Sequence, residues 1–310
     1  MNNSDILFLY DAKLTNPNGD IDDENRPRMD YERSINLVSD VRLKRYIRDY
    51  LQQQGYEIFV GKMDGETINA TERIKRLFNQ QKVNNLTREQ QDWMLDQLID
   101  VRLFGATMPI KAAESKGSSM TFTGPVQFNW GYSLNKVNLV ESASITSHFG
   151  SDDKSDGGAI GKDYRVYYSF LAFHGIVSGH RAEHTRLKEE DLKKLDEALI
   201  KSIPLNATRS KVGQYPRLYL RVEYNTPDFL IGDLRDLVNL NKTEGLRSIT
   251  EVILNVRALV DKLLEYNERI SSLILWQDTN LTITDGDKTT NDFVSVLPES
   301  LRSKVSLCEG

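Results

Sequence analysis

Apolar and polar positions divide the chain into short strand-like and helix-like segments. Residues 6–14 form a largely apolar run that predicts a buried first strand. Residues 217–224 alternate instead, with Leu218, Leu220 and Val222 on one face, which predicts a second strand. Strand-like segments also lie at 56–61, within 123–133, 137–146 and 164–177, and near 273–276 and 281–284.

Helical spacing is found in four longer segments. One covers residues 37–54 and is ended by Gly55, and a second follows a capping box formed by Thr87 and Gln90 and is ended by Gly105. The others cover 187–203 and 248–269, while residues 69–85 are expected to be partly helical. Strands and helices mix without strict alternation, and the chain shows no internal repeat and no linker. The pattern therefore predicts an α+β fold with large insertions between its core elements.

Three polar segments separate these elements. Residues 16–34 form a loop with turn residues Pro17, Gly19 and Pro27, and residues 111–124 are rich in serine, glycine and lysine. Residues 148–163 are polar and rich in glycine, and they lie between two strand-like runs that could pair as a hairpin stem. A loop of this length is usually either functional or disordered.

The composition is that of an ordinary soluble protein. The chain has 310 residues, of which 39% are hydrophobic and 27% charged, and its formal net charge is −5. This charge argues only weakly against a nucleic-acid partner, because phosphate binding depends on a local basic stripe and not on the average. Cys308 is the only cysteine, which fits a reducing compartment. No apolar run is long enough for a membrane helix, so we expect a cytoplasmic protein without membrane contact.

The acidic residues 20–24 do not match a calcium-binding loop. Such a loop needs glycine at its sixth position and glutamate at its twelfth. Counted from Asp20, these positions hold Asn25 and Tyr31, and the count from Asn18 fails as well. A solvated acidic turn is the better interpretation, and no cofactor is expected.

Three histidines form the second candidate metal site. His180 and His184 have the spacing that could bind zinc on a helix, with His174 nearby in the sequence. The zinc-protease pattern needs glutamate directly after the first histidine, where this chain has Arg181. Gly175 and Gly179 also argue against a continuous helix, so packing or surface histidines are favoured over a metal site.

The helix predicted at 37–54 has two different sides. At about 100° per residue, one arc holds its apolar residues Leu43, Tyr46, Ile47, Tyr50 and Leu51. The remaining, exposed side holds Arg42, Lys44, Arg45 and Arg48. Such a stripe could follow a phosphate backbone, although a solvated amphipathic helix has the same pattern.

Several motifs occur in a specific order along the chain. These are "NPNGD" with "NRPRMD", then "LVSDVRLKRYIR", "DVRLFGATMP", "GPVQFNWGYSL", "FLAFHGIVSG" and "TRSKVGQYPRLYLRVEY". In this order they resemble the backbone subunit of the type I-B CRISPR Cascade complex, in the DevR-like branch of the Cas7 family and the RAMP superfamily. The resemblance covers most of residues 5–225, and the C-terminal third is less distinctive.

The resemblance implies a fold and a function. The fold is a single domain, residues 1–310, with an RRM-like (ferredoxin-like) palm, a helical finger insertion at about 60–124 and a β-hairpin thumb at about 143–166. The function is that of a non-catalytic RNA-binding subunit of an antiviral ribonucleoprotein. Copies polymerise as a helical filament along the spacer of the CRISPR RNA and present it to target DNA. The implied partners are the CRISPR RNA, target DNA through the guide, further copies of the chain and other Cascade subunits.

The basic stripe and the resemblance together assign a set of RNA-binding residues. A guide varies in sequence, so its holder should contact phosphate and sugar and leave base edges free. The acids 20–24 are expected to pair with an adjacent copy or to face solvent, and a surface loop is an equally good interpretation of Arg209 and Lys211. The assigned residues are Asn18, Arg26, Arg28, Ser39, Arg42, Lys44, Arg45, Arg48, Met108, Lys111, Lys116, Lys162, Arg165, Arg209 and Lys211.

Two features limit this assignment. No strand has the aromatic pattern with which ordinary RRM domains read bases, so base stacking on the sheet is not expected. A metal-dependent nuclease remains the alternative function, using the three histidines or the aspartates Asp152, Asp153 and Asp156 of the thumb loop. The same chain would also suit a complex that serves RNA-guided transposition.

Overall fold

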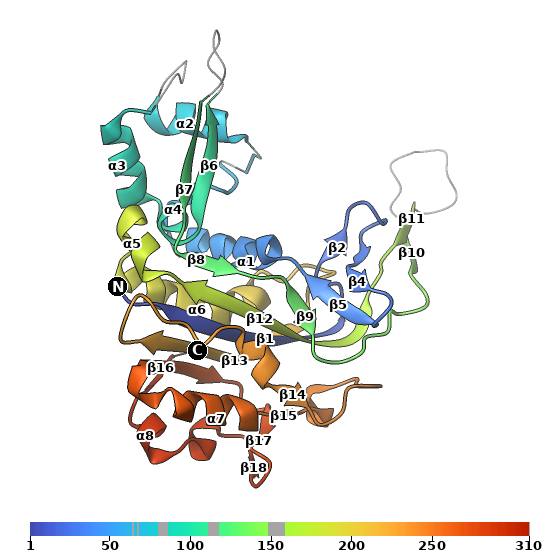
Figure 1. Cartoon of the computed structure of the whole chain (residues 1–310). Helices are drawn as coiled ribbons and strands as arrows, with labels where there is room; N and C mark the ends of the chain where they lie inside the picture. Colours follow the sequence, from blue (N-terminus) through green and yellow to red (C-terminus); the bar gives the residue numbers. More distant parts are fainter. Residues whose placement is uncertain (64, 67, 80–85, 111–117, 148–158, 310) are drawn as a thin grey trace.

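The computed structural model describes residues 1–63, 65–66, 68–79, 86–110, 118–147 and 159–309 (Figure 1). Strands and helices mix as the sequence predicts, and the α+β class is confirmed. Among the described residues, nine strands form one main sheet, and none of the described helices combines the length and apolar character needed to cross a bilayer.

The centre of the sheet is built around its first strand. β1 (Ser4–Thr15) pairs antiparallel with β12 (Val166–Val177) on one side and with β13 (Gln214–Tyr224) on the other. β8 (Val126–Phe128) lies antiparallel to β12, so the central order is β13-β1-β12-β8. Helix α1 (Asp40–Gln53) follows β1 in the chain, and α6 (Glu189–Leu205) connects β12 to β13.

The sheet continues beyond this centre in both directions. Beyond β12 the strand order continues with β9 (Gly131–Ser133), then β5 (Ile35–Val38) and then β4 (Met29–Asp30). Next to β13 lie β16 (Ile270–Gln277) and the parallel edge strand β19 (Val305–Leu307). The first and last parts of the chain therefore share one sheet.

Two hydrophobic cores cover the two faces of the central strands. Ile6, Phe8 and Tyr10 of β1 pack with apolar residues of α1 and α6. Leu7 and Leu9 face the other way and pack with the C-terminal third. That third contains β14 (Asn239–Leu240), β15 (Ile253–Asn255), α7 (Arg257–Glu265), β17 (Thr282–Thr284), β18 (Thr289–Thr290) and α8 (Glu299–Arg302).

Insertions project from one side of the sheet. The first contains α2 (Ala70–Phe78), α3 (Arg88–Gln97), α4 (Ile99–Phe104) and the hairpin of β6 (Gly105–Ile110) with β7 (Ser118–Thr123), and it has a small core of its own. The second is the hairpin of β10 (Ser144–Ser147) with β11 (Ala159–Lys162). Figure 1 shows both hairpins rising on the same side of the sheet, with α1, β8 and β9 between them. The short pair β2 (Gly19–Asp20) and β3 (Arg26–Pro27) lies near the second hairpin, and α5 (Gly179–Thr185) follows β12.

Several predictions of elements are confirmed. The strands at 6–14 and 217–224 are present as β1 and β13, and Leu218, Leu220 and Val222 share one core. The capping box of Thr87 and Gln90 starts α3, and the helix at 187–203 is α6. The segment 69–85 is helical where it is described, as α2.

The prediction of a helix over 37–54 was partly wrong. Residues up to Val38 belong to β5, which pairs with β9, and the helix begins only at Asp40 because the Ser39 side chain caps it. The strand predicted at 56–61 is absent. The backbone N–H groups of Phe59 and Val60 donate to the carboxylate of Asp100 and not to a neighbouring strand.

Three other segments also differ from prediction. The loop predicted at 111–124 ends in strand β7, which pairs with β6 over its whole length. The helix predicted at 248–269 contains β15, which pairs with β17, and the shorter helix α7. Of the strand-like run 137–146 only the end is a strand, β10. In each case pairing with a distant segment prevails over the local pattern.

The close packing of β9 on β12 generates a stability prediction. A Cβ added at Gly131 would lie 2.3 Å from Cε2 of the buried Phe173 ring, so Gly131→Ala should lower the free energy of unfolding by about 1–3 kcal/mol. At Gly61 the nearest atom would be 3.5 Å away, so Gly61→Ala should change the stability by less than about 0.5 kcal/mol. Urea unfolding of the two variants checks this, and equal midpoints would contradict the packing.

Candidate nucleic-acid interface

The first turn of α1 is tied to the polar loop that precedes it. Asn18 Oδ1 accepts hydrogen bonds from the backbone N–H and the hydroxyl of Ser39, both at 2.9 Å. The Ser39 hydroxyl in turn accepts from the backbone N–H of Arg42 at 3.3 Å. Two of the assigned residues, Asn18 and Ser39, are thereby fixed beside a third.

Arg42 and Lys211 form a pair of cations without a described acidic partner. The Arg42 guanidinium lies 4.0 Å from the centroid of the Tyr46 ring, and its Nε is buried without a hydrogen-bond partner among the described residues. Lys211 Nζ donates to the backbone carbonyls of Asn16 and Pro17. Burial lowers the pKa of Lys211 to about 7, and the charge of Arg42 adds to this effect. An anion placed here would be stabilised by both groups.

Other polar atoms around this pair also lack a described partner. The Tyr10 hydroxyl, Asn16 Oδ1 and Gln214 Oε1 are all buried and unpaired among the described residues. Gln214 Nε2 donates to the Lys211 carbonyl at 3.0 Å, Lys211 donates to the Asn16 carbonyl, and the Tyr10 hydroxyl lies within reach of the charge of Arg42, so the three residues adjoin this pair. Most buried polar atoms in proteins are paired, and a cluster of exceptions marks a candidate ligand site. We call Arg42, Lys211 and Gln214 the cation site.

Lys44 and Arg48 do not stand on an exposed side of α1, and that prediction was wrong. Each side chain is only 11% exposed. Lys44 Nζ donates to Asp40 at 3.2 Å and to Gln127 Oε1 at 3.1 Å, and Arg48 Nε donates to Asp100 at 3.0 Å. The ring of Phe104 lies beside both cations, because α4 and β8 pack along this side of the helix.

Arg45 is exposed as predicted. Its side chain is 41% exposed, and it pairs with Asp49 at 2.8 Å one turn along the helix. The four cations of the basic stripe therefore differ. Arg45 is exposed, and Arg42 belongs to the cation site. Lys44 and Arg48 are largely covered and already have partners.

Asp100 is the centre of the covered part. Its side chain is fully buried and accepts from Arg48 Nε and from the backbone N–H groups of Phe59 and Val60, at 3.0, 2.8 and 3.0 Å. These contacts join α1 to the segment after it and to the first insertion. The sequence shows no local signal for this role, because its three partners lie 40 to 52 positions away.

The loop 16–34 is also attached to the base of the second hairpin. Glu24 accepts from Lys162 Nζ and from the Tyr164 hydroxyl, each at 2.7 Å, and Arg26 lies 4.7 Å from the Tyr164 ring centroid. The hydrogen bond from Lys162 lowers the pKa of Glu24. Two assigned cations, Lys162 and Arg26, therefore meet in one cluster.

The expectation for the acidic residues 20–24 was wrong for three of them. Glu24 pairs with Lys162, Asp20 pairs with Arg28 at 2.9 Å, and Asp23 pairs with Arg26 at 3.7 Å, so all three have cationic partners within the same chain. They are thus neither free for an adjacent copy nor merely solvated.

A third group of cations lies nearby. Arg165 donates to Asp163 at 2.8 Å and to the carbonyls of Leu14 and Arg209, and Arg209 itself is 68% exposed.

Of the remaining assigned residues, Met108 lies on β6 opposite Met120. Lys111, Lys116 and the aspartates Asp152, Asp153 and Asp156 lie outside the described residues.

The histidines are arranged differently from the metal-site hypothesis. His180 and His184 do share a helix, α5, so the argument from Gly179 was wrong. His180 pairs with Asp228 at 3.0 Å, and His174 Nδ1 is buried on β12 without a described partner. Within the described part of the chain, no three residues of the types that hold metals are grouped to do so.

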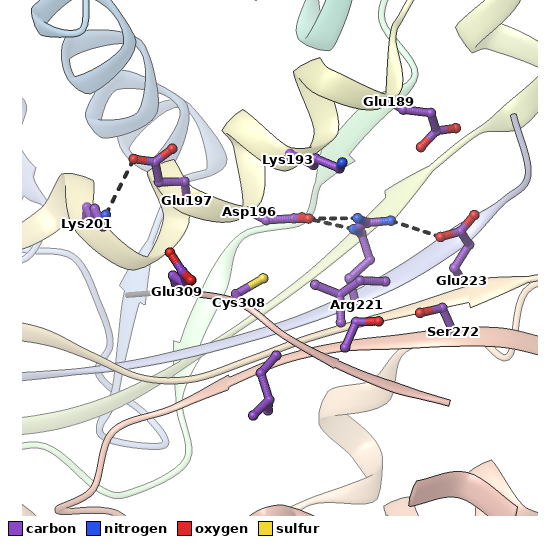
Figure 2. Close-up of a pocket in the computed structure, with 13 residues that line it drawn as sticks. Glu189, Lys193, Asp196, Glu197, Lys201, Arg221, Glu223, Ser272, Cys308 and Glu309 are labelled. Carbon is purple, nitrogen blue, oxygen red and sulfur yellow. Dashed lines mark hydrogen bonds and ion pairs between the residues drawn. The ribbon is translucent and has the colours of Figure 1, made fainter. Parts of the chain in front are cut away.

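A cavity elsewhere provides a comparison for the cation site. It has a volume of about 560 Å³ and lies between α6 and the strands β13, β16 and β19 (Figure 2). Figure 2 shows Arg221 between Asp196 and Glu223, with distances of 2.7 and 3.6 Å. The cavity is lined by more acids than bases, and burial raises the pKa of Glu223. It therefore suits a polyanion less well than the cation site does.

A family model and a curated relative identify one family. A family model described as "CRISPR-associated protein Cas7" matches residues 2–257. A protein of Haloferax volcanii with the same description is 35% identical over 322 residues, which cover 97% of this chain and 94% of the relative. A solved chain of a "CRISPR RNA-guided surveillance complex" has 14% identity and a TM-score of 0.49, covering 89% of this chain and 88% of its own. A second, described as pre-nicking, has 14% identity, a TM-score of 0.48 and 86% coverage of both chains.

The different surroundings of Arg48 and Arg45 generate a prediction. Arg48→Ala leaves the buried Asp100 carboxylate without its cation and should lower the free energy of unfolding by about 3–5 kcal/mol. Arg45→Ala, three residues earlier on the same helix, removes an exposed pair and should cost about 0–1 kcal/mol. Urea titrations followed by circular dichroism measure both values. A similar small loss for the two variants would show that Arg48 is not needed to hold Asp100.

Proposed function

The chain belongs to the Cas7 family of CRISPR-associated proteins, and from this premise we propose that it is a backbone subunit of a type I-B CRISPR RNA-guided surveillance complex. It binds the guide without cutting it. Copies polymerise along the spacer and, with other Cascade subunits, present it for pairing with target DNA. The chain's own residues supply phosphate and sugar contacts, which leave the base edges free for the target.

The cation site is the observation that carries this proposal. Arg42 and Lys211 lie together without a described carboxylate, and burial already depresses the pKa of Lys211. Holding two cations together is unfavourable in the free chain, and a bound phosphate diester would relieve this cost. The buried Nε of Arg42 has no hydrogen-bond partner among the described residues, and charge-assisted bonds from arginine to phosphate are among the stronger hydrogen bonds in proteins.

The remaining assigned residues extend this contact in two directions. Lys44 and Arg48 continue along α1, where Arg48 donates from its Nε to Asp100, and a phosphate would have to share both cations with their carboxylates. Asn18, Arg26 and Arg28 in the loop, and Lys162 and Arg165 at the base of the second hairpin, approach from the other side. Because Lys162 already binds Glu24, a phosphate there would have to share or replace a carboxylate.

We also propose that the palm is RRM-like and that the two insertions are finger and thumb. The central order β13-β1-β12-β8, with α1 and α6 as its connecting helices, supports a ferredoxin-like βαββαβ core. The insertion at about 60–124 would be the finger, and β10 and β11 would be the stem of the thumb. Their position on either side of α1 suits a strand of RNA that crosses the palm between them (Figure 1).

The proposal is tested by the dependence of binding on RNA length and sequence. Backbone contacts predict that affinity grows with RNA length and changes little among scrambled spacers of equal length. Filter binding with such a set measures this, and unrelated duplex DNA serves as a control. A preference of about a hundredfold for one spacer would contradict a generic holder of the backbone, because it requires direct recognition of bases.

The pKa of Lys211 adds a prediction for pH. Lys211 loses its proton near pH 7 in the free chain, whereas a bound phosphate favours the charged form. RNA affinity should therefore be highest below about pH 7 and fall at higher pH, by at most about tenfold per unit for one linked proton.

Two variants serve as controls for this pH effect. Lys211→Arg keeps its charge throughout this range and should flatten the profile. Lys211→Met should lower the slope of log affinity against log salt by about 0.7 at low pH. If the wild type and Lys211→Arg have the same pH profile, then Lys211 does not contact the RNA.

A further inference from the structure

One exposed aromatic side chain lies beside the assigned residues and has no role in the argument so far. Trp130 follows β8 at the turn into β9 and is 44% exposed. The guanidinium of Arg28 lies 5.8 Å from the centroid of its ring. The sequence motif "GPVQFNWGYSL" contains this tryptophan, but its pattern alone gives no reason to separate it from the apolar residues around it.

The backbone of Trp130 is held firmly although its ring is exposed. Its N–H donates to Asn129 Oδ1 at 2.7 Å, and its carbonyl accepts from Arg235 Nη1 at 2.6 Å. Arg235 is itself buried, paired with Asp233 and placed 4.4 Å from the Tyr132 ring centroid. A fixed backbone reduces the entropy that the ring loses when a ligand covers it, so the exposed ring is prepared for a contact.

The other two tryptophans are engaged within the chain. Trp93 packs edge-to-face on Phe78, with 5.2 Å between the ring centroids, and Trp276 packs against the first core. Among the described residues, Trp130 has no ring–ring contact. Its exposed fraction of 44% is also larger than the 37% of Trp93.

Contacts connect Trp130 to assigned guide-binding residues on two sides. On one side, the Arg28 backbone N–H donates to the carbonyl of Asn18, which is itself bonded to Ser39 at the start of α1. On the other side, Gln127, three residues before Trp130, accepts from Lys44. A single-stranded RNA that contacts both Asn18 and Lys44 would pass close to the Trp130 ring.

We propose that Trp130 is a stacking platform for one nucleobase of the bound single-stranded RNA, with Arg28 at its edge. This rests on the proposed function and adds a base contact to a site otherwise made of phosphate contacts. Stacking suits a guide of any sequence, since every base has a π-face and no base edge is read. The guanidinium of Arg28 beside the ring favours a polyanion over a neutral protein partner as the occupant.

The first experiment separates stacking from charge. Trp130→Ala should weaken RNA binding by roughly 5- to 140-fold, the change that corresponds to base–aromatic stacking, and should leave the salt slope unchanged because no phosphate contact is lost. Trp130→Phe should restore most of the affinity. Trp93→Ala removes an exposed tryptophan far from the site and should bind like the wild type.

The second experiment uses Trp130 itself and does not depend on whether the alanine variant folds. Trp93→Phe combined with Trp276→Phe leaves Trp130 as the sole tryptophan. Its fluorescence should be quenched by a single-stranded RNA too short to hold two copies of the chain. An RNA of the same length in which the stacked nucleotide has no base should quench it less. Quenching only with longer RNA that holds several copies would place Trp130 at a contact between copies and overturn the proposal. Quenching only after complementary DNA is added would also overturn it.

The outcomes distinguish this inference from the proposed function. If the wild type binds RNA but Trp130→Ala binds equally well, or the fluorescence does not change on binding, Trp130 is not a platform and the backbone function stands. If the wild type binds no RNA, the proposed function itself fails.

Discussion

Strand β1 presents Ile6 and Phe8 to one core and Leu7 and Leu9 to the other, so both faces of its central part are buried. This double burial limits where the proposed RNA could bind. An RRM-like sheet that binds RNA ordinarily leaves one face open for stacked bases. Here the C-terminal third covers that face, and α1 and α6 cover the opposite one. What remains is the rim formed by α1, the β8–β9 turn and the two hairpins, and the candidate residues gather there.

Most cations on this rim already have partners within the chain. Lys44, Arg48 and Lys162 each bind a carboxylate, so a phosphate must share them or displace an acid. Arg42 and Lys211 differ because no described carboxylate neutralises them. A phosphate at this point gains two charges without breaking an ion pair, and for this reason the cation site should contribute more per contact than the paired cations.

Helices and strands were predictable where they depend on neighbouring residues, whereas the candidate site depends on contacts between residues far apart in the sequence. β1, α6 and the capped start of α3 follow from apolar spacing and caps within a few residues. The exposure of Lys44 and Arg48 was misjudged, because helical periodicity cannot show that α4 and β8 cover one side of α1. Asp100 was missed for the same reason, since its partners lie far away in sequence. The basic residues were nevertheless found, because positive charges clustered on one helix are visible without the fold.

The distribution of charge explains how a chain with a net charge of −5 can suit a polyanion. Its acids are concentrated away from the cation site or are neutralised near it. The cavity under α6 is lined by more acids than bases, and it lies between that helix and β13, β16 and β19 (Figure 2). On the rim, Asp20, Glu24 and Asp100 are held by arginine or lysine. Within about 10 Å, the Debye length at moderate salt, a phosphate at the cation site therefore meets local charge and not the molecular average. An acidic chain can bind RNA in this way, provided that the acids near the cation site stay paired with cations of the same chain while Arg42 and Lys211 remain available to a phosphate.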